Sequence, residues 1–366
     1  MSIERTLSGV ICVAVFVWSA SASDTIRACV QKEIDDGMFL GAVVTAGRPG
    51  KVLFCEAFGQ RDLGKRMSTD CLFDVASITK VVTVATALAI TMEKHPEVSL
   101  EQRVQKYLPS MNGKGADRIT IRNTAAHRSG LDNTKELCSK FAGEELVVKI
   151  MSRDTQWEVG SRYEYSCLGI IRLGEVIASI NGCEFGAYCR EKVFVPLGMT
   201  NTYFSPVPQG VRERCVATDA PLGVVADPNA RGIGRPVGNA GVFTTAQDLA
   251  KLAELWLQRG QYAGTRLFSP AICDEFTSGS IVWHSSLPRD HKPSFPLPRN
   301  VSSSTFYHSG YTGQLLIVDP ERSAYVIVLT AWLHPSIKAS YEDSRKARGR
   351  IAAAVIATHL GDETRH

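Results

Sequence analysis

Strand-like segments lie near both ends of this chain, and they restrict how it can fold. Near the N-terminus, GAVVTAG (41–47) and KVLFCEAFG (51–59) are joined across Arg48-Pro49-Gly50, which is a hairpin signal. Near the C-terminus three more segments follow one another: STFYHSG (304–310), GQLLIVDP (313–320) and SAYVIVLT (323–330). Segments so far apart share one sheet only if the two ends of the chain meet. We therefore predict one antiparallel five-stranded sheet with strands from both ends.

Helical patterns occupy most of the remaining chain. Residues 24–39 place Ile26, Val30, Ile34 and Met38 on one stripe, and a last helix is expected from about 337 to 360. Between about 97 and 260 the pattern is mostly helical, with loops rich in glycine, proline and asparagine. The predicted fold class is therefore α/β (α+β), with the terminal helices flanking the sheet.

Composition excludes several kinds of function. Of 366 residues, 44% are apolar and 21% charged, and the net charge of +4 is spread without a strong basic patch. This gives no nucleic-acid footprint, so the expected partner is a small-molecule or peptide substrate. The basic run RKARGR at 345–350 is interpreted as a solvated helix face. The eight histidines are scattered and HExxH is absent, so we expect no metal and no organic cofactor.

The N-terminus has the organisation of a signal peptide. Arg5 precedes the apolar run GVICVAVFVW (9–18), and Ala20-Ser21-Ala22 follows as a cleavage pattern. We predict a signal peptide over residues 1–22 and a secreted or periplasmic protein; an uncleaved membrane anchor is the alternative. A peripheral contact with the cell envelope is compatible with export. Nine of the ten cysteines follow the signal, and an odd number leaves at least one thiol without an intramolecular partner.

The segment FDVASITKVV (73–82) contains a serine and a lysine three positions apart. If Ser77 opens a helix, Lys80 lies on the same face about one turn further on. A serine hydroxyl needs a neighbour that takes its proton, and a buried lysine with a lowered pKa can do so. A helix N-cap and a surface lysine would have the same spacing, so this segment alone decides nothing.

Two later segments add to this pattern. Tyr165 stands at a loop-to-helix transition, 88 positions after Ser77, and a lysine ammonium close to a tyrosine would lower its pKa from about 10. In YHSGYTG (307–313), His308, Ser309 and Gly310 end a strand, where they can line a pocket. The glycine permits close backbone approach, and the following amide can complete an oxyanion hole.

Taken in order, these motifs resemble those of the penicillin-recognising serine hydrolases: class C beta-lactamases, DD-peptidases (penicillin-binding proteins) and related carboxylesterases. ITIRNTAAHRSGLD, VFVPLGMTNT, NAGVFTTAQDLAKL and GYTGQLLIVDPERSAYVIVLT are similar to further landmarks in the family's order, over roughly residues 24 to 360. The resemblance implies a discontinuous α/β lobe (24–75 and 300–366), a mainly helical lobe (76–299) and a catalytic cleft between them. It also implies an acyl-enzyme on Ser77, with Lys80 and Tyr165 as the acid/base pair and the backbone N–H groups of Ser77 and Tyr311 as the oxyanion hole.

Two positions in the expected substrate-binding set depart from the family pattern. Cys167 stands where many members have asparagine, and a thiol is a poor partner for an acylamido group, which favours esters. His308 stands where beta-lactamases usually have lysine. Since histidine has a reference pKa of about 6.5, we expect weaker, pH-dependent binding of a substrate carboxylate, with efficiency on anionic substrates falling from pH 6 to 8.

Other polar residues have structural interpretations. His127 is expected to be structural, because serine–lysine chemistry needs no histidine. Asp227 and Asn229, in the loop 227–241, form turns or contact substrate. The predicted function is a serine hydrolase acting on an ester, a D-alanyl peptide or a beta-lactam. The alternative is a catalytically silent binding or scaffold protein.

Overall fold

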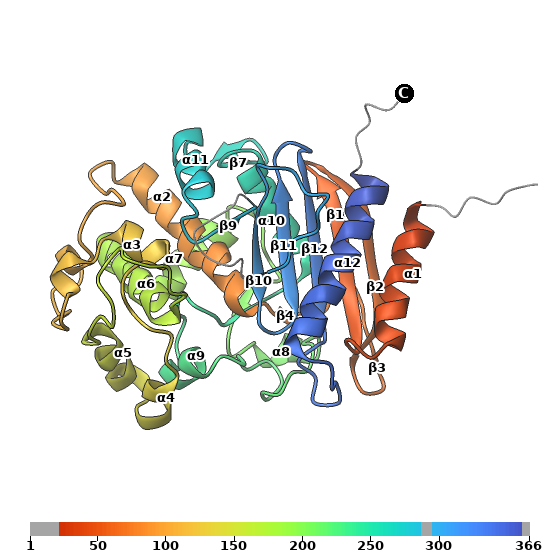
Figure 1. Cartoon of the computed structure of the whole chain (residues 1–366), viewed down its shortest axis with the longest axis horizontal. Helices are drawn as coiled ribbons and strands as arrows, with labels where there is room; N and C mark the ends of the chain where they lie inside the picture. The colour runs from red at the N-terminus through yellow and green to blue at the C-terminus, as the bar shows by residue number, and fades with distance from the viewer. Residues whose placement is uncertain (1–21, 287–294, 361–366) are drawn as a thin grey trace, which may run out of the picture.

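The computed structural model describes residues 22–286 and 295–360 (Figure 1). Within these residues, one antiparallel sheet has seven strands in the order β3-β2-β1-β12-β11-β10-β9. Their bounds are Lys65–Arg66, Lys51–Asp62, Gly41–Arg48, Ala324–Thr330, Gln314–Asp319, Phe306–Gly310 and His284–Ser285. β1 pairs with β12 from Ala42↔Thr330 to Gly47↔Tyr325, so the two ends of the chain share the sheet, as predicted.

The predicted number of strands, five, is wrong. All five expected strands are present, and β3 and β9 extend the sheet at its two edges. Each of these edge strands has only two residues, which is too short for alternation to be visible in a sequence.

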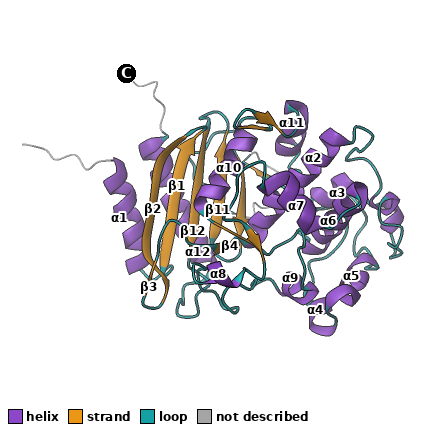
Figure 2. Ribbon diagram, turned by 180° about the vertical axis from the view of Figure 1, so that it is seen from behind, coloured by secondary structure: helices purple, strands orange, loops and turns teal. Residues whose placement is uncertain are grey.

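Helices cover both faces of the sheet, which explains why its central strands are continuous apolar runs. α1 (Ala22–Asp35) and α12 (Tyr341–His359) lie on one face, and α10 (Ala246–Leu257) lies on the other (Figures 1 and 2). The sheet has a hydrophobic core on each face, and alternate residues of β12 pack into one or the other. Val326 and Val328 pack with the terminal helices, whereas Ile327 and Leu329 pack toward α10. Both expected terminal helices are confirmed, with bounds shifted by a few residues.

The segment 76–299, expected to be mainly helical, also contributes to the sheet layer through α10 and β9. A second sheet has the order β4-β6-β5 (Phe73–Asp74, Val242–Thr244, Tyr203–Phe204), and β7 and β8 (Gln261–Tyr262, Thr265–Arg266) form a hairpin. The other helices are α2 (Thr86–Lys94), α3 (Ile121–Ala125), α4 (Glu136–Lys140), α5 (Gly143–Met151), α6 (Cys167–Asn181), α7 (Phe185–Cys189), α8 (Gln209–Arg212), α9 (Pro228–Ile233) and α11 (Pro270–Ser278).

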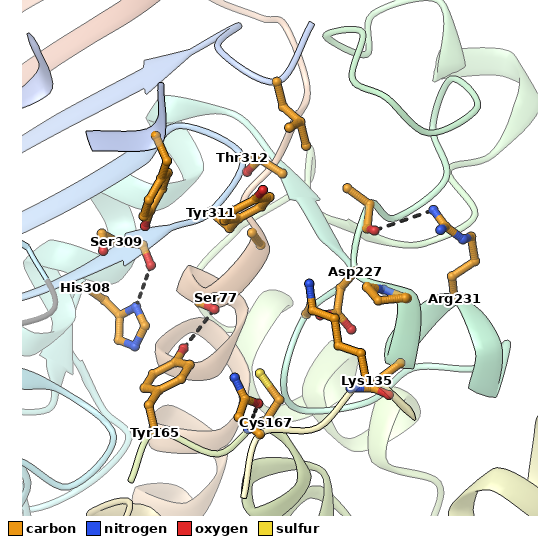
Figure 3. A pocket seen from close by; sticks show the side chains of 18 of the residues that line it. Ser77, Lys135, Tyr165, Cys167, Asp227, Arg231, His308, Ser309, Tyr311 and Thr312 are labelled. Carbon is orange, nitrogen blue, oxygen red and sulfur yellow. Dashed lines mark hydrogen bonds between the residues drawn. The ribbon is translucent and has the colours of Figure 1, made fainter. Parts of the chain in front are cut away.

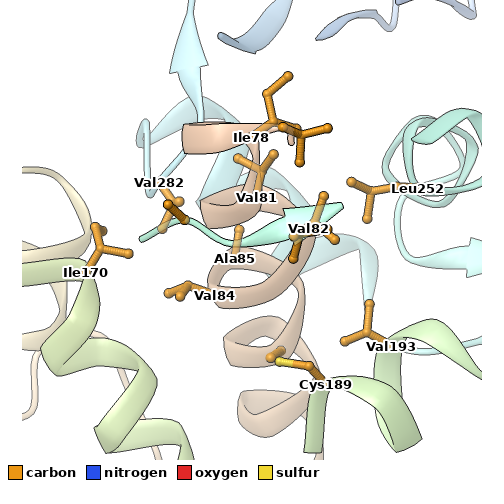
Figure 4. Packing of buried hydrophobic residues seen from close by; sticks show 14 of the residues in the cluster. Ile78, Val81, Val82, Val84, Ala85, Ile170, Cys189, Val193, Leu252 and Val282 are labelled. Atoms are coloured by element: carbon orange, nitrogen blue, oxygen red, sulfur yellow. The ribbon is translucent and has the colours of Figure 1, made fainter. Parts of the chain in front are cut away.

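A central apolar helix runs between the sheet layer and the helical part. It begins with the 3₁₀ turn η1 (Ala76–Ile78), passes through the π-helical turn η2 (Val81–Ala85) and continues as α2. Its side chains point in several directions, toward Ile170 of α6, Leu252 of α10 and Val193 (Figure 4). The stretch Ala76–Lys94 is long and apolar enough to cross a membrane, but 89% of its most apolar window is buried. It is therefore the core helix of this fold.

The basic run at 345–350 is not a uniformly solvated face, contrary to the prediction. Arg348 is fully buried, and its Nη1 donates to the carbonyl oxygens of Gln314 (2.7 Å) and Gly310 (3.4 Å). Arg350, by contrast, forms a partly exposed ion pair with Glu33. Neighbouring positions of a helix face different directions, so one arginine of the run points at the sheet.

The predicted signal peptide (1–22) lies outside the described residues except for Ala22, where α1 begins. All nine cysteines of the described residues are free, including the closely spaced Cys183 and Cys189.

Candidate active site

Ser77 stands on a tight turn between β4 and the central helix. Ala76, directly before it, has φ +43°, a left-handed conformation that costs energy for a residue with a side chain. The buried carboxylate of Asp74 stabilises this turn, because it accepts the N–H groups of Ala76 (2.9 Å) and Ala226 (2.8 Å). Burial raises the pKa of Asp74 to about 6. The turn leaves Ser77 partly exposed at the start of a helix whose residues 78–91 are all buried.

Lys80 lies one turn further along and is fully buried. Its Nζ donates to Ser77 Oγ (2.9 Å) and to the carbonyl oxygen of Asn239 (2.8 Å). Burial lowers the pKa of Lys80, but the charges that Cys167 and Tyr165 can carry raise it by more, so its pKa lies above the ordinary value. The raising contributions come from the ionised forms of Cys167 and Tyr165, so Lys80 holds its proton most firmly when Tyr165 is a tyrosinate.

Tyr165 approaches Ser77 from a second direction. Its hydroxyl donates to Ser77 Oγ (2.9 Å), and Lys80 Nζ lies 5.1 Å from the centre of its ring. Burial raises the pKa of Tyr165 by more than Lys80 lowers it, so the expected lowering is wrong and the resting group is a neutral phenol.

The loop before α6 is fixed by hydrogen bonds that position Tyr165. Ser166 caps α6 by accepting the N–H of Gly169 (3.2 Å), and its own N–H donates to His127 Nδ1 (3.2 Å). The His127 ring lies 4.4 Å from the Tyr165 ring. His127 thus contacts the tyrosine and the loop that carries it, in agreement with a structural role.

The end of β10 lies directly against the Ser77 turn. A Cβ added at Gly310 would lie 2.5 Å from the carbonyl oxygen of Val75, so only glycine fits there without displacing backbone. Thr312 Oγ1 donates to the carbonyl oxygen of Asp74 (2.6 Å) and ties the following turn to the same segment. Tyr311, between these two residues, is 52% exposed.

His308 and Ser309 lie on the same side of Ser77 as Tyr165 (Figure 3). His308 is buried, and its Nδ1 lies 3.0 Å from the carbonyl oxygen of Ser309. Burial, followed by the nearby His284 and Lys80, lowers the pKa of His308 well below its ordinary value. This direction disfavours a charged His308, so the expected fall of carboxylate binding from pH 6 to 8 loses its physical basis.

Cys167 is the first residue of α6 and lines the opposite side of the site (Figure 3). Burial raises the pKa of its thiol, so it is not a thiolate at neutral pH. Its N–H donates to Asn133 Oδ1 (2.9 Å), which places a side-chain amide beside the position where the family often has asparagine.

These residues border a cavity of about 500 Å³. Ser77, Tyr165, Cys167, His308, Ser309 and Tyr311 line it; Lys80 reaches it only through Ser77, and Gly310 packs behind it. Asp227 and Asn229 also line it, and Asp227 caps α9 by accepting the N–H of Ala230 (2.8 Å), so the same residue forms a turn and borders the cavity.

Several cavity residues had no signal in the sequence, namely Asn133, Lys135, Asp219, His284, Leu333 and Tyr341. They come from several loops, from β9 (His284) and from the start of α12 (Tyr341), so no motif spacing identifies them. Among residues 22–286 and 295–360, no group of three histidine, cysteine or carboxylate side chains is arranged to hold a metal ion.

Comparison with known proteins agrees with this geometry. The chain is 25% identical over 317 residues to a putative D-alanyl-D-alanine carboxypeptidase of Escherichia coli (strain K12), which covers 74% of this chain and 71% of the relative. Its fold is similar to that of the hydrolase EstCE1, described as having promiscuous acyltransferase activity (TM-score 0.70, 20% identity, 90% and 98% of the two chains). It is also similar to that of a class C beta-lactamase (TM-score 0.74, 18% identity, 93% and 97%).

The family assignment follows from the length of the match as well as from the site. The beta-lactamase family model matches residues 26–349, which includes every strand of the main sheet and all three motifs. The chain therefore belongs to the beta-lactamase family.

Proposed function

We propose that the chain is a serine hydrolase that cleaves carboxylic esters through an acyl-enzyme on Ser77. The observation that carries this proposal is the convergence of a buried and a partly buried group on one hydroxyl: Lys80 Nζ and Tyr165 Oη each lie 2.9 Å from Ser77 Oγ. A silent scaffold has no need of this arrangement, because it buries a cation at some cost in stability.

The pair would act as the base after it loses one proton. The remaining proton stays on Lys80, and the tyrosinate form of Tyr165 is stabilised by that ammonium. Tyr165 then takes the proton of Ser77 as Oγ attacks the ester carbonyl carbon, and the N–H groups of Ser77 and Tyr311 stabilise the oxyanion.

The second half of the reaction would use the same groups. Tyr165 gives its proton to the leaving alcohol as the C–O bond breaks, which leaves the acyl group on Ser77. It then takes a proton from water, which attacks the acyl carbon, and returns that proton to Ser77 Oγ when the acid leaves. Protons balance over one turnover.

Three observations support esters as substrates. Cys167 offers a weak hydrogen-bond partner where an acylamido group would need a strong one. The neutral His308 provides no cation for a substrate carboxylate. The relative EstCE1 is a hydrolase with acyltransferase activity. A D-alanyl peptide is the second candidate, because Asn133 places an amide at the cavity wall and the E. coli relative carries that name.

The test combines a chromogenic short-chain ester with a fluorescent penicillin. Ester turnover that is lost in Ser77→Ala and kept in the control Ser139→Ala, an exposed serine of α4, supports the proposal. Strong labelling by the penicillin with little ester turnover would favour the peptidase. No turnover and no labelling in any protein would favour the scaffold. We also propose export through residues 1–22 and the lobe division 24–75/300–366 and 76–299.

A further inference from the structure

The carbonyl oxygen that holds Lys80 belongs to a loop with little backbone support. Lys80 Nζ donates to the Asn239 carbonyl oxygen (2.8 Å), and both residues are fully buried. Within the described parts of the chain, no backbone–backbone hydrogen bond involves residues 235–240. Such a loop is held by packing and by its side chains, and the side chain nearest this oxygen is that of Asn239 itself.

Asp227 fixes the Asn239 side chain. Its Oδ1 accepts a hydrogen bond from Asn239 Nδ2 (3.0 Å) as well as the one from the N–H of Ala230 (2.8 Å). A carboxylate only accepts hydrogen bonds, so the amide atom that faces it is the nitrogen. A buried donor that loses its acceptor is costly, so without Asp227 the Asn239 amide would turn toward another partner and take its carbonyl group with it.

Asp227 also acts on Lys80 through its charge. Burial lowers the pKa of Lys80, and negative charges on Cys167, Tyr165 and Asp227 raise it. Burial raises the pKa of the Cys167 thiol and that of the Tyr165 phenol, so neither group is charged in the resting site. Of these three groups, Asp227 is therefore the one that carries its negative charge before the reaction begins.

We infer that Asp227 is a positioning residue for the proposed base: it holds Lys80 in place through Asn239, and its charge keeps a proton on Lys80 when Tyr165 gives up its own. This inference rests on the proposed function, in which the tyrosinate form of Tyr165 takes the proton of Ser77. Among the described residues, the hydrogen bonds of Asp227 go to Ala230 and Asn239, so it acts on the serine through Lys80.

Other titratable groups surround Asp227 and Lys80, and all of them remain in the variants that change only Asp227 or Asn239. Tyr165, Cys167 and His308 act on Lys80 or are acted on by it. The charged or titratable groups around Asp227 are Asp74, Lys135, Cys138, Asp219 and Arg231. Burial raises the pKa of Asp74 to about 6, and Asp227 adds to this rise. The pH profiles are therefore taken above pH 7, where Asp74 no longer titrates.

Two variants separate the charge from the geometry. Asp227→Asn keeps an oxygen that can accept from Asn239, so the maximal kcat/KM on a chromogenic ester should stay within about 3-fold of the wild type. Its rise of kcat/KM with pH should move to lower pH by about 0.5 unit, because a charge that favours the protonated pair is gone. Asn239→Ala keeps that charge and breaks the link, so the maximum should fall about 10-fold with the rise unmoved.

Asp227→Ala loses both the charge and the link, so it should show both effects. Adding Asn239→Ala to it should lower the maximum by less than about 2-fold more, since the link is already broken. The Asp227 cap on Ala230 stays intact in Asn239→Ala, which makes this variant the control for loss of the α9 cap. A fall in Asp227→Ala with none in Asn239→Ala would show that Asp227 only caps α9 and would overturn the inference. An unmoved pH profile in Asp227→Asn would overturn it as well.

A second measurement needs no turnover. Urea titrations at pH 7 compare the wild type, Asp227→Asn, Lys80→Met and the double variant. Asp227→Asn should lower the free energy of unfolding more when Lys80 is present than when methionine replaces it, and equal changes in the two backgrounds refute the support of Lys80 by Asp227. If no ester is cleaved, or if cleavage survives Ser77→Ala, the proposed function fails instead, and the titrations still decide whether Asp227 stabilises the charged Lys80.

Discussion

Replacing Gly310 with alanine tests whether the end of β10 must lie as close to the Ser77 turn as the structure places it. The added Cβ would lie 2.5 Å from the Val75 carbonyl oxygen and 3.3 Å from its carbonyl carbon. Both contacts are with backbone, so no side-chain rotation relieves them. The two segments must separate by about 0.5 Å, the difference between 2.5 Å and the 3.0 Å below which Cβ contacts essentially never occur.

That separation acts directly on the proposed oxyanion hole. The N–H of Tyr311 follows Gly310, and the N–H of Ser77 comes two residues after Val75. Removing one oxyanion donor costs about 10²- to 10³-fold in kcat, and a misplacement of 1 Å can cost about 10²-fold. For a smaller shift we expect Gly310→Ala to lower kcat by about 10- to 100-fold, with KM changed by less than about 3-fold.

Gly47→Ala is a matched control with a clash in the same sheet but far from the site. Its Cβ would lie 2.7 Å from the Lys51 carbonyl oxygen and 2.3 Å from Tyr325 Oη, and Gly47 pairs with the opposite end of β12. Both variants should lose about 1–3 kcal/mol of unfolding free energy in urea titrations, the usual cost of overpacking. Only Gly310→Ala should lose kcat on a chromogenic ester. Equal kcat values for the two folded variants would refute the close-approach reasoning.

Tyr165→Phe should lower kcat by about 10²- to 10⁴-fold with little change in unfolding free energy, because it removes the proposed proton carrier and keeps the ring; unchanged turnover would exclude that role. With pKa values of both Lys80 and Tyr165 above their ordinary values, kcat/KM should rise with pH from 6 to 9 as the pair loses a proton, and a flat profile would contradict the assigned resting state. The folded-state pKa of Asp74 is raised from 3.8 to about 6, so its contribution to the free energy of unfolding is greatest below pH 4 and falls by up to about 3 kcal/mol as the pH rises through 6. Urea titrations at pH 4.5 and pH 7 should therefore show a smaller change in unfolding free energy for Asp74→Asn than for the wild type. Cys167→Asn should raise amide or beta-lactam turnover relative to ester turnover, and an unmoved ratio would show that the thiol does not set this preference.

The long strands and the serine–lysine pair were predictable for simple physical reasons. β1, β11 and β12 are buried on both faces, so each is a continuous apolar run in the sequence. Ser77 and Lys80 share a helix face because of helical periodicity alone. Tyr165, 88 residues away, could not be placed by spacing, and its position followed only from the family resemblance.

The errors and omissions have a common physical cause, since each depends on the surroundings of a group. The pKa of Tyr165 depends on how fully its hydroxyl is buried, and that of His308 on the basic groups around it. Asn133 accepts the N–H of Cys167 through its side-chain oxygen, and Asn239 accepts from Lys80 Nζ through its backbone oxygen. Single contacts of this kind leave no pattern in a sequence. The burial of Arg348 depends on how α12 is rotated against the sheet.

Arg348 also has a consequence for when the proposed active site is completed during synthesis of the chain. Its guanidinium, carried by the last helix, donates to the Gly310 and Gln314 carbonyl oxygens on either side of the turn that presents Tyr311. β1, near the start of the chain, has no partner on its inner edge until β12 has been made. The serine turn is thus translated early, whereas the groups that complete its site arrive with the final residues. For the proposed hydrolase, a ribosome-bound chain would carry Ser77, Lys80 and Tyr165 but would lack the Arg348 contacts beside Tyr311 until α12 docks.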